Sequence, residues 1–408
     1  MKNPILKSLL ISLIAFGFST ATSYGMTLYL YTPESAGPIT PVATPSVGGG
    51  LNIDPSAPRT SECPINGVMY TTAEQKVWET RRPLFVMIEN SVDARPQSGL
   101  GSADIVYEAV AEGGVTRFGA VFYCGVAKAD TIVGPVRSAR THFINLASEY
   151  NYPLYAHVGG ANCSSADGGK TCTTDKRVQA LEQLSSYGWV GRTGNDLNQF
   201  SIGFPTFWRD YERMGRTVAT EHTMYSSTEK LWKYASGTRG WTNLAPESVM
   251  PKNAKLDWKD NFTKFTWKDD AAESARGDVA KISFGFWESY HDFDVTWSYD
   301  KTSNTYTRTN GDAAHKDRND DKQFTAKSVL VQFAKELGPL DDHKHMLYEV
   351  IGSGEGILFQ DGTATEITWS KKDRESRTVF KDGKGKPVSF NRGTLWVEIL
   401  PTDNKVVY

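Results

Sequence analysis

The second part of the sequence alternates apolar and polar side chains with a period of two residues, a pattern that an extended strand places on opposite faces. The alternation begins near residue 245 and recurs in short segments, among them VAKISFGFW, FDVTWSYD, SVLVQFAKE and TLWVEIL. Asn310–Gly311, Asp361–Gly362 and Asp382–Gly383 separate such segments, and these dipeptides are strong signals for hairpin turns. The pattern therefore predicts a mainly antiparallel β domain over residues 241–408.

The preceding part, residues 61–240, mixes the two kinds of pattern. PLFVMIEN, ADIVYEAVAE, RFGAVFYCG and YPLYAHV are typical of strands, whereas DKRVQALEQLSSYG has helical spacing and ends at Gly188. With 39% hydrophobic residues the chain can bury a substantial core. We therefore predict an α+β protein, in which a mixed α/β N-terminal domain is followed by a mainly antiparallel β C-terminal domain.

Residues 1–31 predict export. Lys2 and Lys7 precede a run without charge from Ser8 to Tyr31. A short apolar core followed by small residues fits a cleaved secretory signal, whereas the whole run is long enough for one transmembrane helix. We favour an uncleaved signal-anchor, because Tyr29 and Tyr31 suit a membrane interface, and this places the globular part outside the cytoplasm. Residues 32–60, rich in Pro, Gly, Ser and Thr, are interpreted as a linker.

The chain has four cysteines, and export would permit disulfide bonds. Cys163 and Cys172 flank the polar loop SSADGGKT, and we predict a disulfide between them. For Cys63 and Cys124 the sequence leaves both pairing and separate burial open. Because no CxxC motif and no nearby pair of histidines accompanies these cysteines, no metal site is predicted.

Several classes of function receive no support from the sequence. The formal net charge is only -2, so nothing global indicates a nucleic-acid partner. The sequence contains no nucleophile elbow, Walker loop, dinucleotide fingerprint or zinc-protease helix, so neither a cofactor nor catalytic residues are assigned. The glycine-rich segment GSGEGILFQDG (352–362) lies between strands with no helix after it, and we interpret it as hairpin turns.

The segment GPVRSARTHFINLASEY (134–150) raises the possibility of an anion site. From Val136 onward its apolar residues recur at helical spacing, which places Arg137 and Arg140 in the predicted first turn. A helix N-terminus favours anions and disfavours cations, so two arginines there are favourable when an anion binds at the same point. Arg117 and the Ser138 hydroxyl are candidates to complete a pocket for phosphate or carboxylate.

The same arginines have a purely structural interpretation. Asp104, Glu108 and Glu112 have the same parity along one predicted strand and therefore face the same side of it. Buried carboxylates need partners, because an unpaired buried charge is very costly. Arg117, Arg137 and Arg140 are the candidates to neutralise Glu108 and Glu112.

Other polar residues cluster at the ends of predicted elements. The complete candidate set for ligand binding is Arg95, Arg117, Arg137, Ser138, Arg140, His157, Gly159 and Gly160. Residues expected to line the site or to be structural are Asn90, Gln97, Glu108, Glu112 and His222.

Long motifs of the sequence resemble the YerB-like bacterial lipoproteins, a two-domain family of unknown function. The resemblance lies in VMIENSVDARPQSGLGSADIVYEAVAEGGVTRFGAVF, GPVRSARTHFINLASEY, YAHVGG and HTMY, and continues through SVLVQFAK, GSGEGILFQDG, TEITW and GTLWVEILP. It spans residues 85–400 and implies an extracytoplasmic protein tethered to the membrane, without implying an activity. This chain has no lipid-attachment cysteine near its N-terminus, so its tether would be the peptide segment itself.

Two functional hypotheses follow. The first is a membrane-anchored protein of the cell envelope that binds a phosphate-bearing or other anionic ligand at the arginine pocket. The second is a non-enzymatic accessory protein that docks another envelope protein, with purely structural arginines. They differ in whether Arg137 and Arg140 face an open cleft or are buried against Glu108 and Glu112.

Overall fold

The computed structural model of the chain describes residues 50–163, 172–246 and 257–408. The predicted anchor, residues 1–31, and most of the predicted linker lie outside these ranges. No helix within them is long and apolar enough to cross a membrane.

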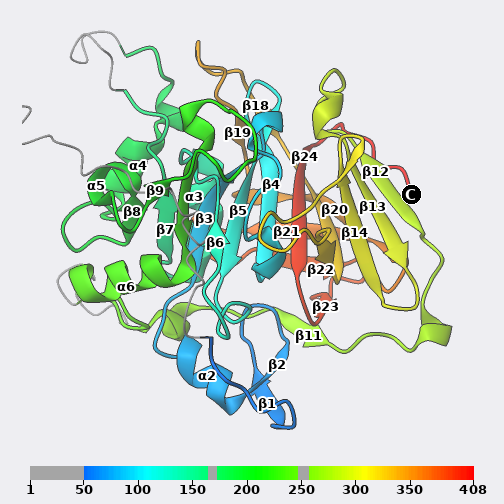
Figure 1. Cartoon of the computed structure of the whole chain (residues 1–408). Coiled ribbons are helices and arrows are strands. Elements are labelled where there is room, and N and C mark those ends of the chain that lie inside the picture. The colour runs from blue at the N-terminus through cyan, green and yellow to red at the C-terminus, as the bar shows by residue number, and fades with distance from the viewer. Residues whose placement is uncertain (1–49, 164–171, 247–256) are drawn as a thin grey trace, which may run out of the picture. The chain divides into compact units, whose positions relative to one another are not determined.

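The N-terminal part alternates strands with short helices, as its mixed sequence pattern predicts (Figure 1). Its helices are α2 (Thr72–Trp78), α3 (Thr141–Ala147), α4 (Ala180–Ser186), α5 (Gln199–Ile202) and α6 (Thr228–Arg239). Its strands are β1 (Arg59–Glu62), β2 (Met69–Thr71), β3 (Leu84–Glu89), β4 (Ile105–Glu112), β5 (Val115–Phe122), β6 (Ile132–Val133), β7 (Leu154–His157), β8 (Asp196–Asn198), β9 (Trp208–Arg209) and β10 (Met224–Ser227).

The C-terminal part consists mainly of strands, most of them paired antiparallel, as the period-two pattern predicts. The longer ones are β12 (Lys281–Phe284), β13 (Val295–Asp300), β14 (Thr305–Asn310), β17 (Ser328–Ala334), β20 (Gly352–Gln360), β21 (Thr363–Lys371), β22 (Val379–Asp382) and β24 (Leu395–Pro401). The short ones are β11 (Thr266–Lys268), β15 (Ala313–Ala314), β16 (Thr325–Ala326), β18 (Glu336–Leu337), β19 (Leu347–Tyr348) and β23 (Ser389–Asn391).

One ten-stranded mixed sheet runs through both parts, in the order β22-β21-β20-β17-β24-β4-β5-β3-β7-β8. The join is made by β24, which pairs in parallel with β17 on one side and with β4 on the other. Figure 1 shows this red strand beside the cyan β4, although the two are far apart in sequence. The sheet is therefore continuous, although its strands come from both sides of the predicted boundary at residue 240.

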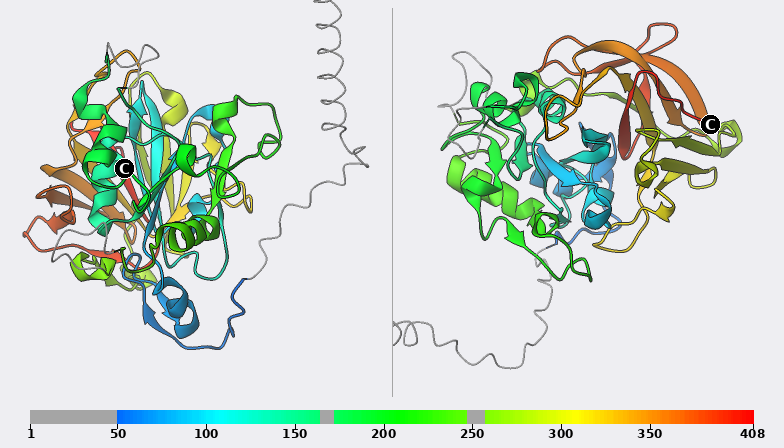
Figure 2. Two further views of the ribbon diagram at one scale, coloured as in Figure 1. Left: turned by 90° about the vertical axis from the view of Figure 1, so that its left-hand side faces the viewer. Right: turned by 90° about the horizontal axis from the view of Figure 1, so that it is seen from above.

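The other elements lie to either side of this join. Helices α4, α5 and α6 gather near β7 and β8, and the sheet of β12, β13 and β14 lies beyond β24 (Figures 1 and 2). Trp297 of β13 and Trp396 of β24 pack edge to face with their ring centroids 5.2 Å apart. This aromatic contact is part of the core between the two sheets.

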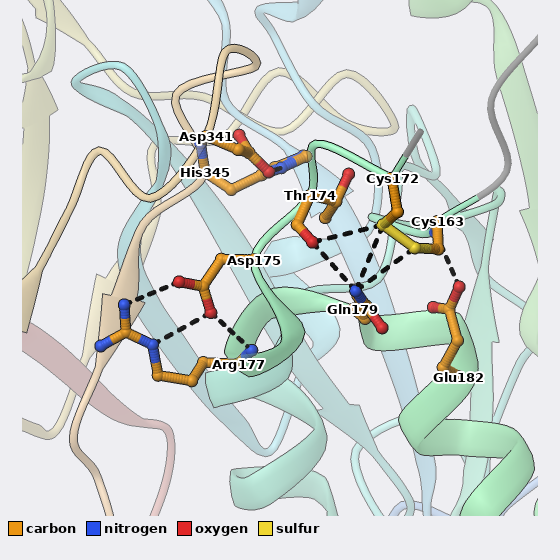
Figure 3. The surroundings of a disulfide bond; sticks show 9 residues. All are labelled: Cys163, Cys172, Thr174, Asp175, Arg177, Gln179, Glu182, Asp341 and His345. Atoms are coloured by element: carbon orange, nitrogen blue, oxygen red, sulfur yellow. Dashed lines mark hydrogen bonds and ion pairs between the residues drawn. A yellow bond between two sulfur atoms is a disulfide. The ribbon is translucent and has the colours of Figure 1, made fainter. Parts of the chain in front are cut away.

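Both cysteine pairs form disulfide bonds. The predicted Cys163–Cys172 bond is confirmed, and Cys63, whose pairing the sequence leaves open, is bonded to Cys124. Figure 3 shows how Gln179 holds the Cys163–Cys172 pair: its amide donates to Thr174 O at 2.9 Å and contacts both sulfurs at 3.5 Å. The bond thus fixes the chain close to the start of α4.

The interpretation of GSGEGILFQDG as hairpin turns is wrong for most of its length. Residues 352–360 form the strand β20, and only Asp361–Gly362 makes a turn, between β20 and β21. Both turn residues have positive φ, 53° and 66°, as a tight hairpin requires. Within β20, a Cβ at Gly354 would lie 2.6 Å from Trp369 Nε1, and a Cβ at Gly356 would lie 2.5 Å from Val331 O, so these two glycines allow close packing of the strands.

Candidate functional site

The segment that carries Arg137 and Arg140 is extended, and the predicted helical start at Val136 is wrong. The helix α3 begins at Thr141, and Arg140 is its N-cap, with φ −136° and ψ 144°. The backbone before it is bound on both sides: the Arg137 amide donates to Met87 O of β3, and the Val158 amide donates to Arg137 O. Because the N–H and C=O groups of Arg137 are already hydrogen-bonded to other strands and turns, they are not available for a first helical turn.

A cavity of about 530 Å³ opens beside this extended segment. Its lining residues are Arg137, Ser138, Val158, Gly159, Gly160, Asn162, Leu181, Phe200, Arg209, Thr220, Glu221 and Met224. They come from the extended segment, from the turn after β7, from α4 and α5, and from the chain around β9 and β10. The cavity thus combines two guanidinium groups with one carboxylate, several uncharged polar groups and an apolar wall.

Arg137 lies at the cavity with an incomplete set of partners. Its Nε is 3.3 Å from Glu89 Oε1 and its side chain is 27% exposed, whereas the Glu89 side chain is only 5% exposed. Glu89 is also 3.0 Å from Nδ1 of His222 and accepts a hydrogen bond from Ser91 Oγ at 3.1 Å. The hydrogen bond with Glu89 raises the pKa of His222. Glu89 is therefore shared, and no described residue accepts a hydrogen bond from the terminal nitrogens of Arg137.

Arg117 and Arg140 are not among the residues that line the cavity, and both pair with Glu112. Arg117 Nη2 is 2.5 Å from Glu112 Oε1, and Arg140 approaches Oε2 with Nε at 2.9 Å and Nη2 at 2.7 Å. Burial by itself raises the pKa of Glu112, but the charges of Arg117 and Arg140 outweigh it and bring that pKa down to about 2. The two arginines are thus bound to a carboxylate, as the structural interpretation predicts for them.

Glu108 has a partner that the sequence does not suggest. It accepts hydrogen bonds from Asn90 Nδ2 at 3.0 Å and from Thr116 Oγ1 at 2.6 Å, and its other oxygen pairs with Arg308 Nη2. The Glu108 and Arg308 side chains are fully buried. The expectation that Arg117, Arg137 or Arg140 neutralises Glu108 is therefore wrong, because a guanidinium of the C-terminal part does so.

Arg95 and Gln97 belong to the same buried polar network and not to the cavity. Arg95 donates to Asn90 O at 3.0 Å and to Asp292 O at 2.7 Å, and its guanidinium lies over the Phe293 ring. Gln97 donates to Glu89 O at 3.0 Å and to Asn90 Oδ1 at 2.8 Å. These contacts tie the loop after β3 to the C-terminal part.

His157 is a buried structural residue beside the cavity. Its Nδ1 lies 2.6 Å from Gly159 O, and its Nε2 pairs with Asp196 of β8. Both ring nitrogens are thus engaged, which holds the turn that carries Gly159 and Gly160. Gly159 has φ +60°, and a Cβ there would lie 3.0 Å from the Phe200 ring.

Of the predicted ligand-binding residues, the structure brings Arg137, Ser138, Gly159 and Gly160 to the cavity. Arg209, Glu221 and Phe200 line it as well, although nothing in the sequence singles them out. Phe200 and Arg209 lie in a stretch without clear periodicity. The only sequence feature that draws attention to Glu221 is its position next to His222. Within the ranges that the structure covers, no group of three histidine, cysteine or acidic residues is arranged to hold a metal ion.

Two residues that line the cavity have unpaired backbone amides. Within the described chain, the amides of Ser138 and Gly160 have no hydrogen-bond acceptor, although the neighbouring Ala139 amide donates to Gly159 O at 2.9 Å. Arg209 uses one terminal nitrogen on Thr220 O and on Thr223 Oγ1. Backbone N–H groups together with guanidiniums are the donors that bind oxyanions in proteins.

Comparison with known proteins agrees with the resemblance seen in the sequence. Residues 70–242 match the N-terminal domain, and residues 282–397 the C-terminal domain, of the family "Protein of unknown function (DUF3048)". YerB of Bacillus subtilis (strain 168), which is named as a lipoprotein, is 29% identical over 353 residues, 85% of this chain and 88% of YerB.

A solved structure shows the same fold. The crystal structure of YerB from Bacillus subtilis superposes with a TM-score of 0.64 at 26% sequence identity. The match covers 86% of this chain and the whole of the YerB chain in that crystal.

Proposed function

The chain belongs to the DUF3048 family of proteins of unknown function, and we propose that it binds, outside the cytoplasm, a small envelope ligand through a phosphate or carboxylate group. The binding site is the cavity at Arg137. The observation that carries this proposal is the position of Arg137 on the cavity wall, with its terminal nitrogens available while Arg117 and Arg140 are held by Glu112.

The surroundings of Arg137 support an anion as the ligand. Arg209 supplies a second guanidinium at the same cavity, and the Ser138 and Gly160 amides supply unpaired N–H donors. Glu89 neutralises Arg137 only in part, since it is shared with His222. An oxyanion bound here gains charge-assisted hydrogen bonds from Arg137 and Arg209 without breaking the buried Glu112 cluster.

An extracytoplasmic, membrane-held location is part of the same proposal. YerB is named as a lipoprotein, and residues 1–31 of this chain predict an export segment. The Cys63–Cys124 and Cys163–Cys172 disulfides are typical of oxidising compartments outside the cytoplasm.

Titration calorimetry of the purified chain with inorganic phosphate tests the anion site. We expect binding that Arg137→Gln weakens by about 10–100-fold, because charge-assisted hydrogen bonds contribute about 1.5–3 kcal/mol. Arg177→Gln is the matched control, since Arg177 is likewise a partly exposed arginine paired with one carboxylate, Asp175, but lies outside the cavity lining. Equal affinities of the Arg137 variant and the parent chain would contradict the proposal.

A non-enzymatic accessory protein that docks another envelope protein is the second candidate. Two observations favour it: Arg117 and Arg140 are structural, and Phe204 and Tyr211, on the chain after α5, are 83% and 56% exposed. If inorganic phosphate, phosphate monoesters and acetate all fail to bind in the titration, this candidate becomes the better one.

A further inference from the structure

We infer that the ligand of the Arg137 cavity is a sugar phosphate, with the phosphate at the arginines and the sugar ring against Phe200. This inference rests on the proposed function and extends it from an anionic group to a class of molecule. Three features of the cavity indicate such a ligand: its size, the ring of Phe200 and the carboxylate of Glu221.

The cavity is much larger than the anion alone. Its volume of about 530 Å³ equals the share of roughly 15–20 water molecules in the liquid. A phosphate group has five heavy atoms and fills only a small part of that space. Most of the ligand volume therefore lies beyond the guanidiniums, against the remaining wall.

That wall presents the ring of Phe200 to the ligand. Phe200 is 75% exposed although it lines the cavity, so most of its side-chain surface is accessible to a ligand. The Cδ2–Cε2 edge of the ring lies close to Gly159, where the absence of a Cβ lets the ring approach the backbone. An exposed aromatic ring that packs against the backbone can stack on the flat, partly apolar face of a ring in the ligand.

Glu221 favours anions that carry hydrogen-bond donors over anions that carry none. A carboxylate in an anion site repels the ligand unless the ligand also offers hydrogen-bond donors to it. A hydrogen bond with its own backbone lowers the pKa of Glu221, and the charges of His222, Arg137 and Arg209 lower it further, so the carboxylate accepts hydrogen bonds at neutral pH. Sugar hydroxyls are such donors, whereas an alkyl chain offers none.

The uncharged polar lining fits the same ligand. Asn162, Ser138 and Thr220 surround the cavity with groups that both donate and accept hydrogen bonds, as hydroxyls do. A site that pairs hydroxyl groups discriminates strongly against ligands that lack them.

Titration of the purified full chain with glucose 1-phosphate, inorganic phosphate, glucose, hexyl phosphate and adenosine monophosphate tests this assignment. We expect glucose 1-phosphate to bind at least tenfold more tightly than any of the other four compounds. Phe200→Ala should weaken glucose 1-phosphate binding by about tenfold and leave phosphate binding unchanged. Phe204→Ala is the matched control, because Phe204 is 83% exposed on the same stretch of chain but does not line the cavity.

The outcomes separate this inference from the proposed function. If phosphate binds with dependence on Arg137 but glucose 1-phosphate is no tighter, the sugar assignment fails and the anion site stands. Tighter binding of hexyl phosphate or adenosine monophosphate overturns the sugar assignment in favour of an alkyl phosphate or a nucleotide ligand. If none of the anions binds, both proposals fail together.

Discussion

Arg117, Arg137 and Arg140 belong to neighbouring elements, yet their surroundings give them different roles. The side chains of Arg117 and Arg140 are 1% and 7% exposed and enclose the Glu112 carboxylate. Burial lowers the pKa of Arg117 to about 10, so it stays charged at neutral pH and needs its partner. Arg137 is 27% exposed, and among the described residues it has one weak ion pair, with Glu89 at 3.3 Å. Removal of these side chains therefore has unequal consequences for stability.

Arg140→Gln should lower the free energy of unfolding by about 2–3 kcal/mol, because two charge-assisted hydrogen bonds to a partly buried carboxylate are lost. Arg137→Gln should change it by less than about 1 kcal/mol, as is usual for a partly exposed ion pair. Urea unfolding of both single variants, followed by tryptophan fluorescence, measures the difference. Similar losses in the two variants would show that Arg137 is as structural as Arg140.

At the scale of elements, strand β20 shows why a glycine-rich segment forms a strand. The Trp369 indole of β21 crosses Gly354 and donates to Phe333 O of β17 at 2.8 Å. A Cβ at Gly354 would lie 2.6 Å from the indole nitrogen and 2.8 Å from Phe333 O. The side chain of Trp369 thus spans three strands only because the middle one carries a glycine.

Gly354→Ala should therefore destabilise the protein by about 1–3 kcal/mol, through overpacking and loss of the indole hydrogen bond. Gly383→Ala is the control, because a Cβ at Gly383 meets no described atom within 4 Å. That variant should stay within about 0.5 kcal/mol of the parent chain. The midpoints of urea unfolding report both effects, and a Gly354 variant as stable as the Gly383 variant would contradict the packing argument.

The strands were predictable from sequence because their signal is local. The alternation of apolar residues and the turn at Asp361–Gly362 depend only on neighbours in the chain. The start of α3 was not predictable, because residues 136–139 have a helical apolar pattern but are bound by β3 and by the turn after β7. Tertiary hydrogen bonding overrides the local preference at this point.

The candidate site was predictable only in part, for the same reason. Arg137, Ser138, Gly159 and Gly160 stand out as polar or glycine residues at the ends of elements, and the cavity includes them. Phe200 and Arg209 reach the cavity from chain that carries no periodic signal. The pairing of Glu108 with Arg308, 200 positions apart, depends on the topology of the whole sheet.

For the molecule as a whole, the central position of β24 makes the two family domains structurally dependent. This strand comes from the end of the chain yet separates β17 from β4, so the strands on either side lose a hydrogen-bonding partner without it. Three fully buried charged or polar side chains meet at this join: Glu108 of β4, Arg308 of β14 and Glu398 of β24. The polar cluster therefore holds the two parts together.

Glu398 binds its proton more tightly in this cluster than an exposed carboxyl group does. Burial raises the pKa of Glu398 well above its ordinary value, and the nearby Glu108 raises it further. Burial and the charge of Arg308 lower the pKa of His315. The ring is therefore neutral, accepting from Arg308 at Nδ1 and donating from Nε2 to Gln97 Oε1 at 2.7 Å.

This protonation predicts an unusual pH dependence for Glu398→Gln. The folded state binds the Glu398 proton more tightly than the unfolded chain, whose ordinary pKa is 4.5. The contribution of Glu398 to stability is thus fully present below that pH, and is lost by about 1.4 kcal/mol per pH unit as the pH rises toward the folded pKa. Glutamine keeps the hydrogen bond from Trp297 Nε1, which is 3.0 Å from Glu398 Oε1, and does not ionise. The variant should therefore match the parent chain near pH 4.5 and become more stable than it as the pH rises from there toward the folded-state pKa of Glu398.

Urea unfolding of the parent chain and of Glu398→Gln between pH 4.5 and pH 9 measures this difference. Arg308→Gln serves as the contrasting variant, because it leaves the buried Glu108 carboxylate without its cation and should cost about 3–5 kcal/mol. A loss of several kcal/mol in Glu398→Gln at every pH would mean that Glu398 is ionised and acts as a necessary anion for Arg308.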